Sequence, residues 1–215
     1  MELAVQVGAS VEYPILIAFV LASLALAISP GPDNIFVLAQ SISTGGRAGL
    51  SVSLGLVVGC LVHTALVAFG VSQVISRSDT LFFGIKLLGA CYLLYLAYQV
   101  YRSGDHILLE GNGGTPRSSF RLFLRGFIMN LLNPKVAIFF LAFFPGFLFS
   151  RELDPVIQFF VLGLLFMGSA LIVFGAISFL AGPISKYLRR NPKAGLYLKW
   201  VQIIVFVGIA AHLLL

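Results

Sequence analysis

The sequence predicts an all-α membrane protein with six transmembrane helices, on two observations. Hydrophobic residues make up 59% of the 215-residue chain and charged residues only 10%, whereas an average soluble domain is about 25% charged. The apolar residues fall in runs of about 20 residues or more, which is long enough to cross a bilayer. We expect spans at about 14–42, 49–75, 81–101, 120–149, 155–181 and 195–215.

Basic residues in alternate loops predict how these spans are oriented. Ten of them lie in or beside the first, third and fifth loops: Arg47, Arg102, Arg117, Arg121, Arg125, Lys186, Arg189, Arg190, Lys193 and Lys199. The opposite side holds only Arg77 and Arg151. Because positive loops stay in the cytoplasm, we expect both termini in the periplasm of a bacterial inner membrane. The net charge of +6 then needs no nucleic-acid partner to explain it.

The span count predicts a single translocator domain, residues 1–215, made of two inverted repeats. The first repeat covers about 14–101 and the second about 120–215, joined by a cytoplasmic linker at about 102–119 that contains the glycine-rich segment 111–114. An odd number of spans in each half inserts the second half upside down, which is the plan of many secondary transporters. Span 1 lacks a basic segment before it, so we expect it to be retained rather than cleaved as a signal peptide.

Proline motifs interrupt spans 1 and 4, with the sequences Ser29-Pro30-Gly31-Pro32 and Asn133-Pro134. A proline inside a helix removes a donor and costs about 3 kcal/mol, and in lipid the freed carbonyls need partners within the protein. We therefore expect each span to split into two half-helices at mid-membrane. Ser29 and Asn133 are the predicted N-caps, each followed by proline at the first helical position, and Gly31 allows a close backbone approach.

Each break carries one charged residue, Asp33 in the first half and Lys135 in the second. A charge at the centre of a span costs about 2.5–3.5 kcal/mol on insertion scales, so such residues usually have a function. Lys135 and the half-helix N-termini could hold the carboxylate of an amino acid, and Asp33 its ammonium group. A carboxyl group removed from water holds a proton more readily, which makes Asp33 the candidate proton carrier. The alternative is a fixed Asp33–Lys135 ion pair that joins spans 1 and 4.

Other residues in the spans give weaker signals. Asn34 is grouped with Asp33 in the candidate site, and Asn130, one turn before Asn133, is expected to satisfy freed carbonyls or to contact substrate. His63 either packs with a hydrogen bond or lines the cavity. The phenylalanine-rich run 139–149 is expected to face lipid or to fill the core.

Small residues recur every four positions on span 2, at Ser51, Gly55 and Gly59. This spacing lets helix backbones approach closely. We expect packing within the monomer, with a homodimer face as the alternative.

These motifs resemble the lysine exporter (LysE/RhtB) family of amino-acid translocators. The resemblance rests on Ser29–Asn34, Thr44–Leu50, Lys86–Leu96, Gly126–Lys135 and Phe143–Pro145, which together span most of residues 15–150. It implies a six-span inner-membrane exporter that exchanges an amino acid for protons. Because the spans contain no second acid beside Asp33, we favour neutral substrates such as threonine, homoserine or leucine, with basic amino acids as the alternative.

Other classes of function fit the sequence less well. A transmembrane thiol relay needs cysteines beside the broken helices, whereas Cys60 and Cys91 lie in spans 2 and 3. An ion channel would not need a charge at each break. No nucleophile–base pair suggests an enzyme, and the three histidines are scattered, so we expect no metal and no cofactor. The expected partners are the amino acid, protons and membrane lipid.

Overall fold

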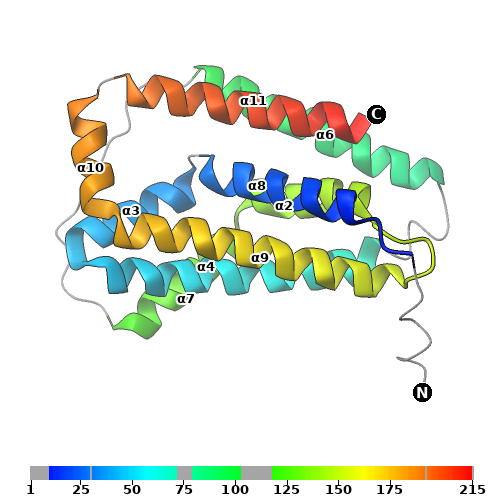
Figure 1. The fold of residues 1–215 in the computed structure, drawn as a ribbon, viewed down its shortest axis with the longest axis horizontal. Helices are drawn as coiled ribbons and strands as arrows, with labels where there is room; N and C mark the ends of the chain where they lie inside the picture. The colour runs from blue at the N-terminus through cyan, green and yellow to red at the C-terminus, as the bar shows by residue number, and fades with distance from the viewer. Residues whose placement is uncertain (1–9, 30, 72–78, 103–117, 192, 215) are drawn as a thin grey trace.

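The computed structural model describes residues 10–29, 31–71, 79–102, 118–191 and 193–214, and every regular element among them is a helix (Figure 1). In chain order these are α2 (Tyr13–Ile28), α3 (Pro32–Thr44), α4 (Gly46–Leu66), the π-helix η2 (Val67–Val71), α6 (Asp79–Arg102), α7 (Ser119–Leu131), α8 (Pro134–Phe143), the 3-10 helix η3 (Phe144–Phe147), α9 (Pro155–Phe179), α10 (Ala181–Arg190) and α11 (Ala194–Leu214).

The helices confirm an all-α, multi-pass membrane protein with two broken spans. Four continuous segments are long and apolar enough to cross a membrane: Gly46–Val71, Phe83–Arg102, Pro155–Phe179 and Ala194–Ala211. Two bent pairs bring the number to six when each pair counts as one span. The α2–α3 pair bends by 58° and the α7–α8 pair by 56°. The predicted linker lies almost wholly outside the described residues, and the inverted repeat stays a prediction.

The second break begins as predicted, but the first does not. Asn133 caps α8, and its side chain accepts a hydrogen bond from the Lys135 N–H, with Pro134 at the first helical position. Ser29, however, is the C-cap of α2, and α3 starts only at Pro32 after an extended Gly31. The prediction of Ser29 as an N-cap was therefore wrong. Either proline of this motif suits the first position of a helix, and the chain uses the second; Pro30 itself lies outside the described residues.

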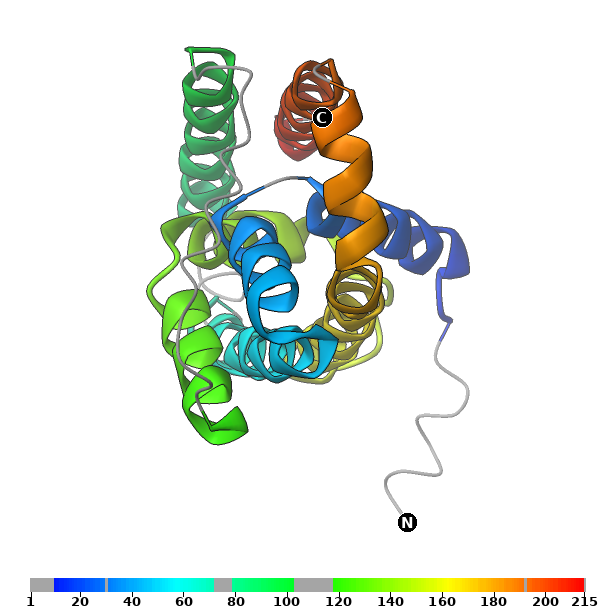
Figure 2. The same ribbon diagram turned by 90° about the vertical axis from the view of Figure 1, so that its left-hand side faces the viewer.

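The core of the bundle is built around α4, which packs along α7 and α9, while α6 and α11 pair with each other at one side (Figure 2). Glycines allow the closest approach. A Cβ on Gly55 would lie 1.9 Å from the Phe123 carbonyl oxygen, and one on Gly126 would lie 2.2 Å from that of Val52. A Cβ on Gly59 would lie 2.7 Å from the Asn130 side chain. The predicted packing role within the monomer is thus confirmed for Gly55 and Gly59.

The phenylalanine-rich run forms core rather than a lipid-facing surface. Its buried rings join one from α2 and one from α9 in a phenylalanine cluster made of Phe19, Phe139, Phe140, Phe143, Phe144, Phe147 and Phe166. Neighbouring ring centroids are between 4.2 Å and 6.1 Å apart. Such stacked and edge-on pairs contribute beyond the area that they bury.

The fifth loop contains a helix that hydropathy does not reveal. In α10, Ile184 and Leu188 are half-buried, while Lys186 and Arg190 are exposed. The helix contacts α3 and α9 at the end of the bundle that carries the basic loops, opposite the start of α2 (Figure 1). Its short amphipathic pattern has no continuous apolar run, so a search for spans passes over it.

Candidate functional site

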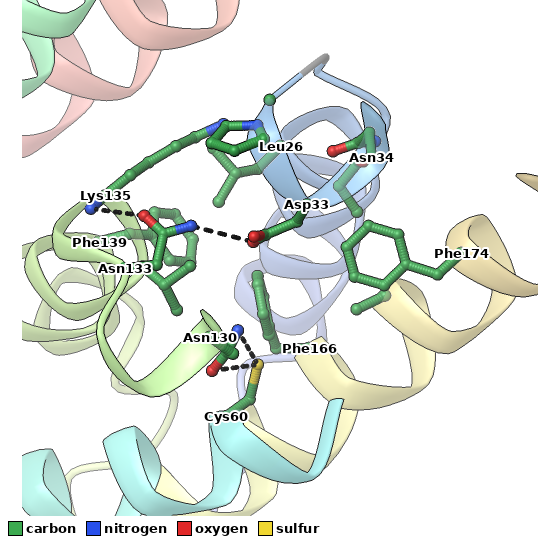
Figure 3. Close-up of a pocket in the computed structure, with 15 residues that line it drawn as sticks. Leu26, Asp33, Asn34, Cys60, Asn130, Asn133, Lys135, Phe139, Phe166 and Phe174 are labelled. Carbon is green, nitrogen blue, oxygen red and sulfur yellow. Dashed lines mark hydrogen bonds between the residues drawn. The ribbon is translucent and has the colours of Figure 1, made fainter. Parts of the chain in front are cut away.

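The two helix breaks meet inside the bundle and are joined by a single side chain. Asn133 Nδ2 donates a hydrogen bond of 3.0 Å to Asp33 Oδ2, across 100 positions of sequence (Figure 3). Asp33 lies in the first turn of α3 and Asn133 caps α8. A candidate residue from each break, Asp33 in the first half and Asn133 in the second, is therefore in direct contact with the other.

Asn133 accepts the hydrogen bonds of the first backbone N–H groups of α8. Its side-chain oxygen accepts from the Lys135 N–H at 3.1 Å, and its carbonyl accepts from the N–H groups of Val136 and Ala137, each at 3.1 Å. Pro134 has no N–H to offer. The expectation that both half-helix ends hold a carboxylate is therefore not met at α8, where these donors are occupied.

The start of α3 differs, because its cap residue has no side chain. The first backbone hydrogen bond of α3 runs from the Ile35 N–H to the Gly31 carbonyl, at 3.0 Å. The N–H groups of Asp33 and Asn34 precede it and have no partner within the helix. Helix N-termini with such donors attract anions. Asn34 turns its own amide to the Ala27 carbonyl at 2.7 Å, so it bridges α2 and α3 across the break.

Lys135 reaches across the pocket towards the start of α3. Figure 3 shows its extended side chain running from α8 to that helix end. The Nζ atom lies 3.4 Å from where a Cβ on Gly31 would be, and 4.9 Å from the ring centroid of Phe206 on α11. Within the described chain no ion pair joins Asp33 to Lys135; the Asp33 carboxylate accepts a hydrogen bond from the amide of Asn133. The fixed ion pair is absent from this conformation.

Asn130 and Cys60 form the floor of the same region. Asn130 is 3% exposed, and its Nδ2 lies 3.5 Å from the Cys60 Sγ. The His63 Nε2 lies 3.2 Å from the Asn130 carbonyl oxygen, and the imidazole packs beside Phe140. Of the two roles expected for His63, packing with a hydrogen bond or lining the cavity, this contact with a carbonyl beside the break corresponds to the first.

In this conformation these residues line a small pocket, with a cavity volume of about 40 Å³, that has a polar side and an apolar side. The polar side brings together predicted residues from both breaks: Gly31, Pro32, Asp33, Asn34, Asn130, Asn133 and Lys135. The apolar side includes Phe139, Phe166 and Phe174. Of the other predicted site residues, His63, Ser29 and Pro134 do not line the pocket.

Sequence reasoning missed several lining residues. Cys60 was set aside because it lies in span 2, yet α4 places it directly beside the α7–α8 break. Cys91 is exposed on α6, so the two thiols do not meet at the site. Phe166 and Phe174 come from α9, a continuous apolar helix in which nothing local marks them. Among the described residues, no group of three or more His, Cys, Asp or Glu could hold a metal ion.

Comparison with known proteins agrees with this architecture. The family model for the LysE type translocator matches residues 24–215. The chain is 33% identical over 176 residues to the homoserine/homoserine lactone efflux protein of Salmonella typhimurium strain LT2, covering 82% of this chain and 84% of that protein. It is 34% identical over the same length to the protein of that description from Salmonella typhi. No solved structure matches. With its two proline breaks joined at a charged pocket, the chain belongs to the LysE type translocator family.

Proposed function

We propose that this protein exports neutral amino acids across the bacterial inner membrane in exchange for protons, with its substrate site in the pocket between the two helix breaks. The observation that carries the proposal is that one carboxylate, that of Asp33, and one amine, that of Lys135, line the same pocket. Free amino acids carry the complementary charges. The efflux function named for the Salmonella relatives supports the direction of transport and the substrate class.

The geometry suggests how an amino acid would bind once the pocket widens from this closed conformation, in which its volume is only about 40 Å³. The carboxylate of the amino acid would lie between the Lys135 amine and the N–H groups of the first turn of α3, since the Lys135 Nζ atom lies 3.4 Å from where a Cβ on Gly31 would be. Its ammonium group fits beside Asp33, where it would displace the amide of Asn133. The side chain of the substrate would then lie against Phe139, Phe166 and Phe174 on the apolar side of the pocket. Each charge of the substrate gains a partner, which offsets the cost of taking it out of water.

The pocket favours neutral over basic side chains. Asp33 is the only carboxylate among the residues that line it, and that group is needed for the substrate's own ammonium. A lysine or arginine substrate would bring a second cation towards Phe166 and Phe174 with no anion to pair it, which is strongly unfavourable. Small neutral amino acids such as homoserine, threonine and leucine avoid this cost.

Proton exchange follows if substrate and proton compete for Asp33. A carboxylate in a low-dielectric site gains from either a proton or an ammonium group, but it cannot hold both. Release of the amino acid on the outer side would leave Asp33 to take up a proton, and release of that proton inside would restore the carboxylate. In this scheme the cytoplasmic loops are the basic ones and both termini are periplasmic.

An excretion profile tests the proposed function. Cells that produce the protein are loaded with dipeptides, and each amino acid released to the medium is measured against cells with the empty vector. We expect faster release of threonine, homoserine or leucine and no change for lysine and arginine. If no amino acid is released faster, the exporter assignment is wrong; selective release of lysine or arginine would support the basic-substrate alternative.

A further inference from the structure

We propose that the substrate leaves the pocket along α2, past the hydroxyl of Ser23, and that the phenylalanine cluster is the gate that closes this route. This inference rests on the proposed export function and adds the path and its gate. The route runs from the helix breaks towards the end of the bundle opposite the basic loops. It lies between α2, α8 and α9.

The phenylalanine cluster reaches without interruption from the pocket to that end of the bundle. Phe139 and Phe166 line the pocket, and their ring centroids are 5.3 Å apart. Phe139 stacks on Phe143 at 4.5 Å, and Phe143 contacts Phe147 in η3 at 4.3 Å. No room for a solute remains between them, because these rings are at most 6% exposed.

Phe19 closes the cluster from the side of the first half of the chain. Its ring lies 5.1 Å from Phe144, 5.4 Å from Phe147 and 5.9 Å from Phe143, and it is fully buried. Because α2 and α8 both run from a helix break towards this end, a rotation at either break would separate Phe19 from the rings of α8. The ring contacts contain no hydrogen bonds, so they can part and re-form without leaving polar groups unpaired.

Hydrogen bonds fix the far end of the cluster in the closed position. Gln158 on α9 is 1% exposed and accepts from the N–H groups of Phe149 and Ser150, at 2.7 Å and 3.0 Å. Its amide donates to the carbonyls of Ser150 and Leu153. The Phe149 carbonyl in turn accepts from the Glu12 N–H at the start of α2. This conformation is therefore the one in which the route is shut.

Ser23 supplies the polar group that such a route needs. It lies on the buried face of α2 between Phe19 and the pocket-lining Leu26 and Ala27. Its hydroxyl is fully buried and has no hydrogen-bond partner. The hydroxyl of Ser29, the C-cap of α2, is also buried without a partner. The buried hydroxyls of Ser41, Ser53, Ser169 and Ser178, in contrast, bond to the carbonyl four residues earlier.

An unpaired buried hydroxyl is costly, and here it points to a group that arrives only during transport. The charged ends of an amino acid leaving the pocket would offer such a partner. A hydroxyl one turn beyond the pocket shortens the apolar distance that the substrate must cross.

Thiol labelling tests the gate. Phe19→Cys is made in a background that carries Cys60→Ala and Cys91→Ser, because Cys60 lines the pocket at the inner end of the route. Whole cells are then treated with a membrane-impermeant cationic methanethiosulfonate. We expect labelling that is faster in cells loaded with exported amino acid and that stops efflux. Phe159→Cys is the matched control, since Phe159 is equally buried near the start of α9 but outside the cluster; we expect it to stay unlabelled.

The outcomes separate the gate from the proposed function. If efflux is measured in these cells but Phe19→Cys is never labelled, the gate is wrong and the export function stands. Equal labelling of the two variants would mean general opening of the bundle, which also overturns the gate. If the parent protein exports no amino acid, the export function itself fails.

Ser23→Ala tests the role of the Ser23 hydroxyl separately. It leaves every ring of the phenylalanine cluster in place, so its result does not depend on whether the cluster accepts a substitution. Removing an unpaired hydroxyl should leave the thermal unfolding midpoint unchanged or raise it. We expect the efflux rate to fall about five-fold, the effect of one lost hydrogen bond to the moving substrate, with substrate binding to the purified protein unchanged. Ser41→Ala, which removes a hydroxyl bonded to its own helix, should not slow efflux. Unchanged efflux in Ser23→Ala would place the route elsewhere.

Discussion

Asn133 has two roles that can be separated by substitution. Its side-chain oxygen caps α8 through the Lys135 N–H, and its side-chain nitrogen holds the Asp33 carboxylate. The first contact stabilises a half-helix, whereas the second positions the group that we propose to carry the proton. A residue with both contacts links the folding of one break to the chemistry of the other.

Replacement of Asn133 should therefore give two different results. Asn133→Ala removes the cap and lowers stability by about 1 kcal/mol, and it also frees Asp33. Asn133→Ser keeps a capping oxygen but has no amide to donate. We expect the thermal unfolding midpoint to fall for the alanine variant and to be largely restored for the serine variant, with efflux impaired in both. Normal efflux in the serine variant would show that the contact with Asp33 is dispensable.

Asp33→Asn tests the proton role directly. The replacement amide still offers an oxygen to the Asn133 amide, so the fold and the unfolding midpoint should be retained. In right-side-out vesicles loaded with amino acid, external acid should accelerate efflux by the parent protein, because protons enter as substrate leaves. The variant should lose this response. Efflux that still follows the pH gradient in the variant would assign the proton to another group.

At the scale of elements, the broken helices depend on unbroken ones. The α4 helix packs along α7 through glycines whose backbones nearly touch, and it holds Cys60 and His63 against the second break. Because α7 ends at that break, its distance from α4 determines where Asn130 lies. Packing remote from the charges thus controls the shape of the pocket.

Gly55→Ala should disturb this packing. The new methyl group would lie 1.9 Å from the Phe123 carbonyl oxygen, so the helices must separate, at a typical overpacking cost of about 1–3 kcal/mol. We expect a lower unfolding midpoint in detergent. Gly168→Ala on α9 is the matched control, since nothing lies within 4 Å of its added carbon, and it should not lower the midpoint. Equal midpoints for the two variants would contradict the close approach of α4 and α7.

How far the sequence predicts each element depends on whether its signal is local. The breaks and their charges were found because a proline or an ion is conspicuous within an apolar run. Which proline starts α3 was missed, since Pro30 and Pro32 satisfy the same rule for the first helical position. Cys60, Phe166 and Phe206 could not be assigned, because their place beside the pocket arises only when α4, α9 and α11 pack around the breaks.

At the scale of the whole molecule, the charged loops predict its direction in the membrane. The end of the bundle with α10 carries Lys186 and Arg190 exposed to solvent, while the opposite end contains the closed side of the phenylalanine cluster. Export requires that the cluster face outward. Export along the proposed route therefore depends on the orientation that the basic loops predict.

Reporter fusions check this orientation. Alkaline phosphatase, which is active only in the periplasm, is joined after residue 215 or after residue 191. We expect an active reporter at the first position and an inactive one at the second. The reverse pattern would invert the bundle and turn the proposed outer gate into an inner one.

The hydrogen bond between Asp33 and Asn133 also has a consequence for how the protein can be divided. Asp33 and Cys60 belong to the first half of the chain, and Asn130, Asn133 and Lys135 to the second, so neither half contains a complete pocket. A half-length polypeptide could bind substrate only by associating with another that supplies the missing break. Two fragments cut between α6 and α7 and produced together in one cell should thus complement each other, although each alone is inactive.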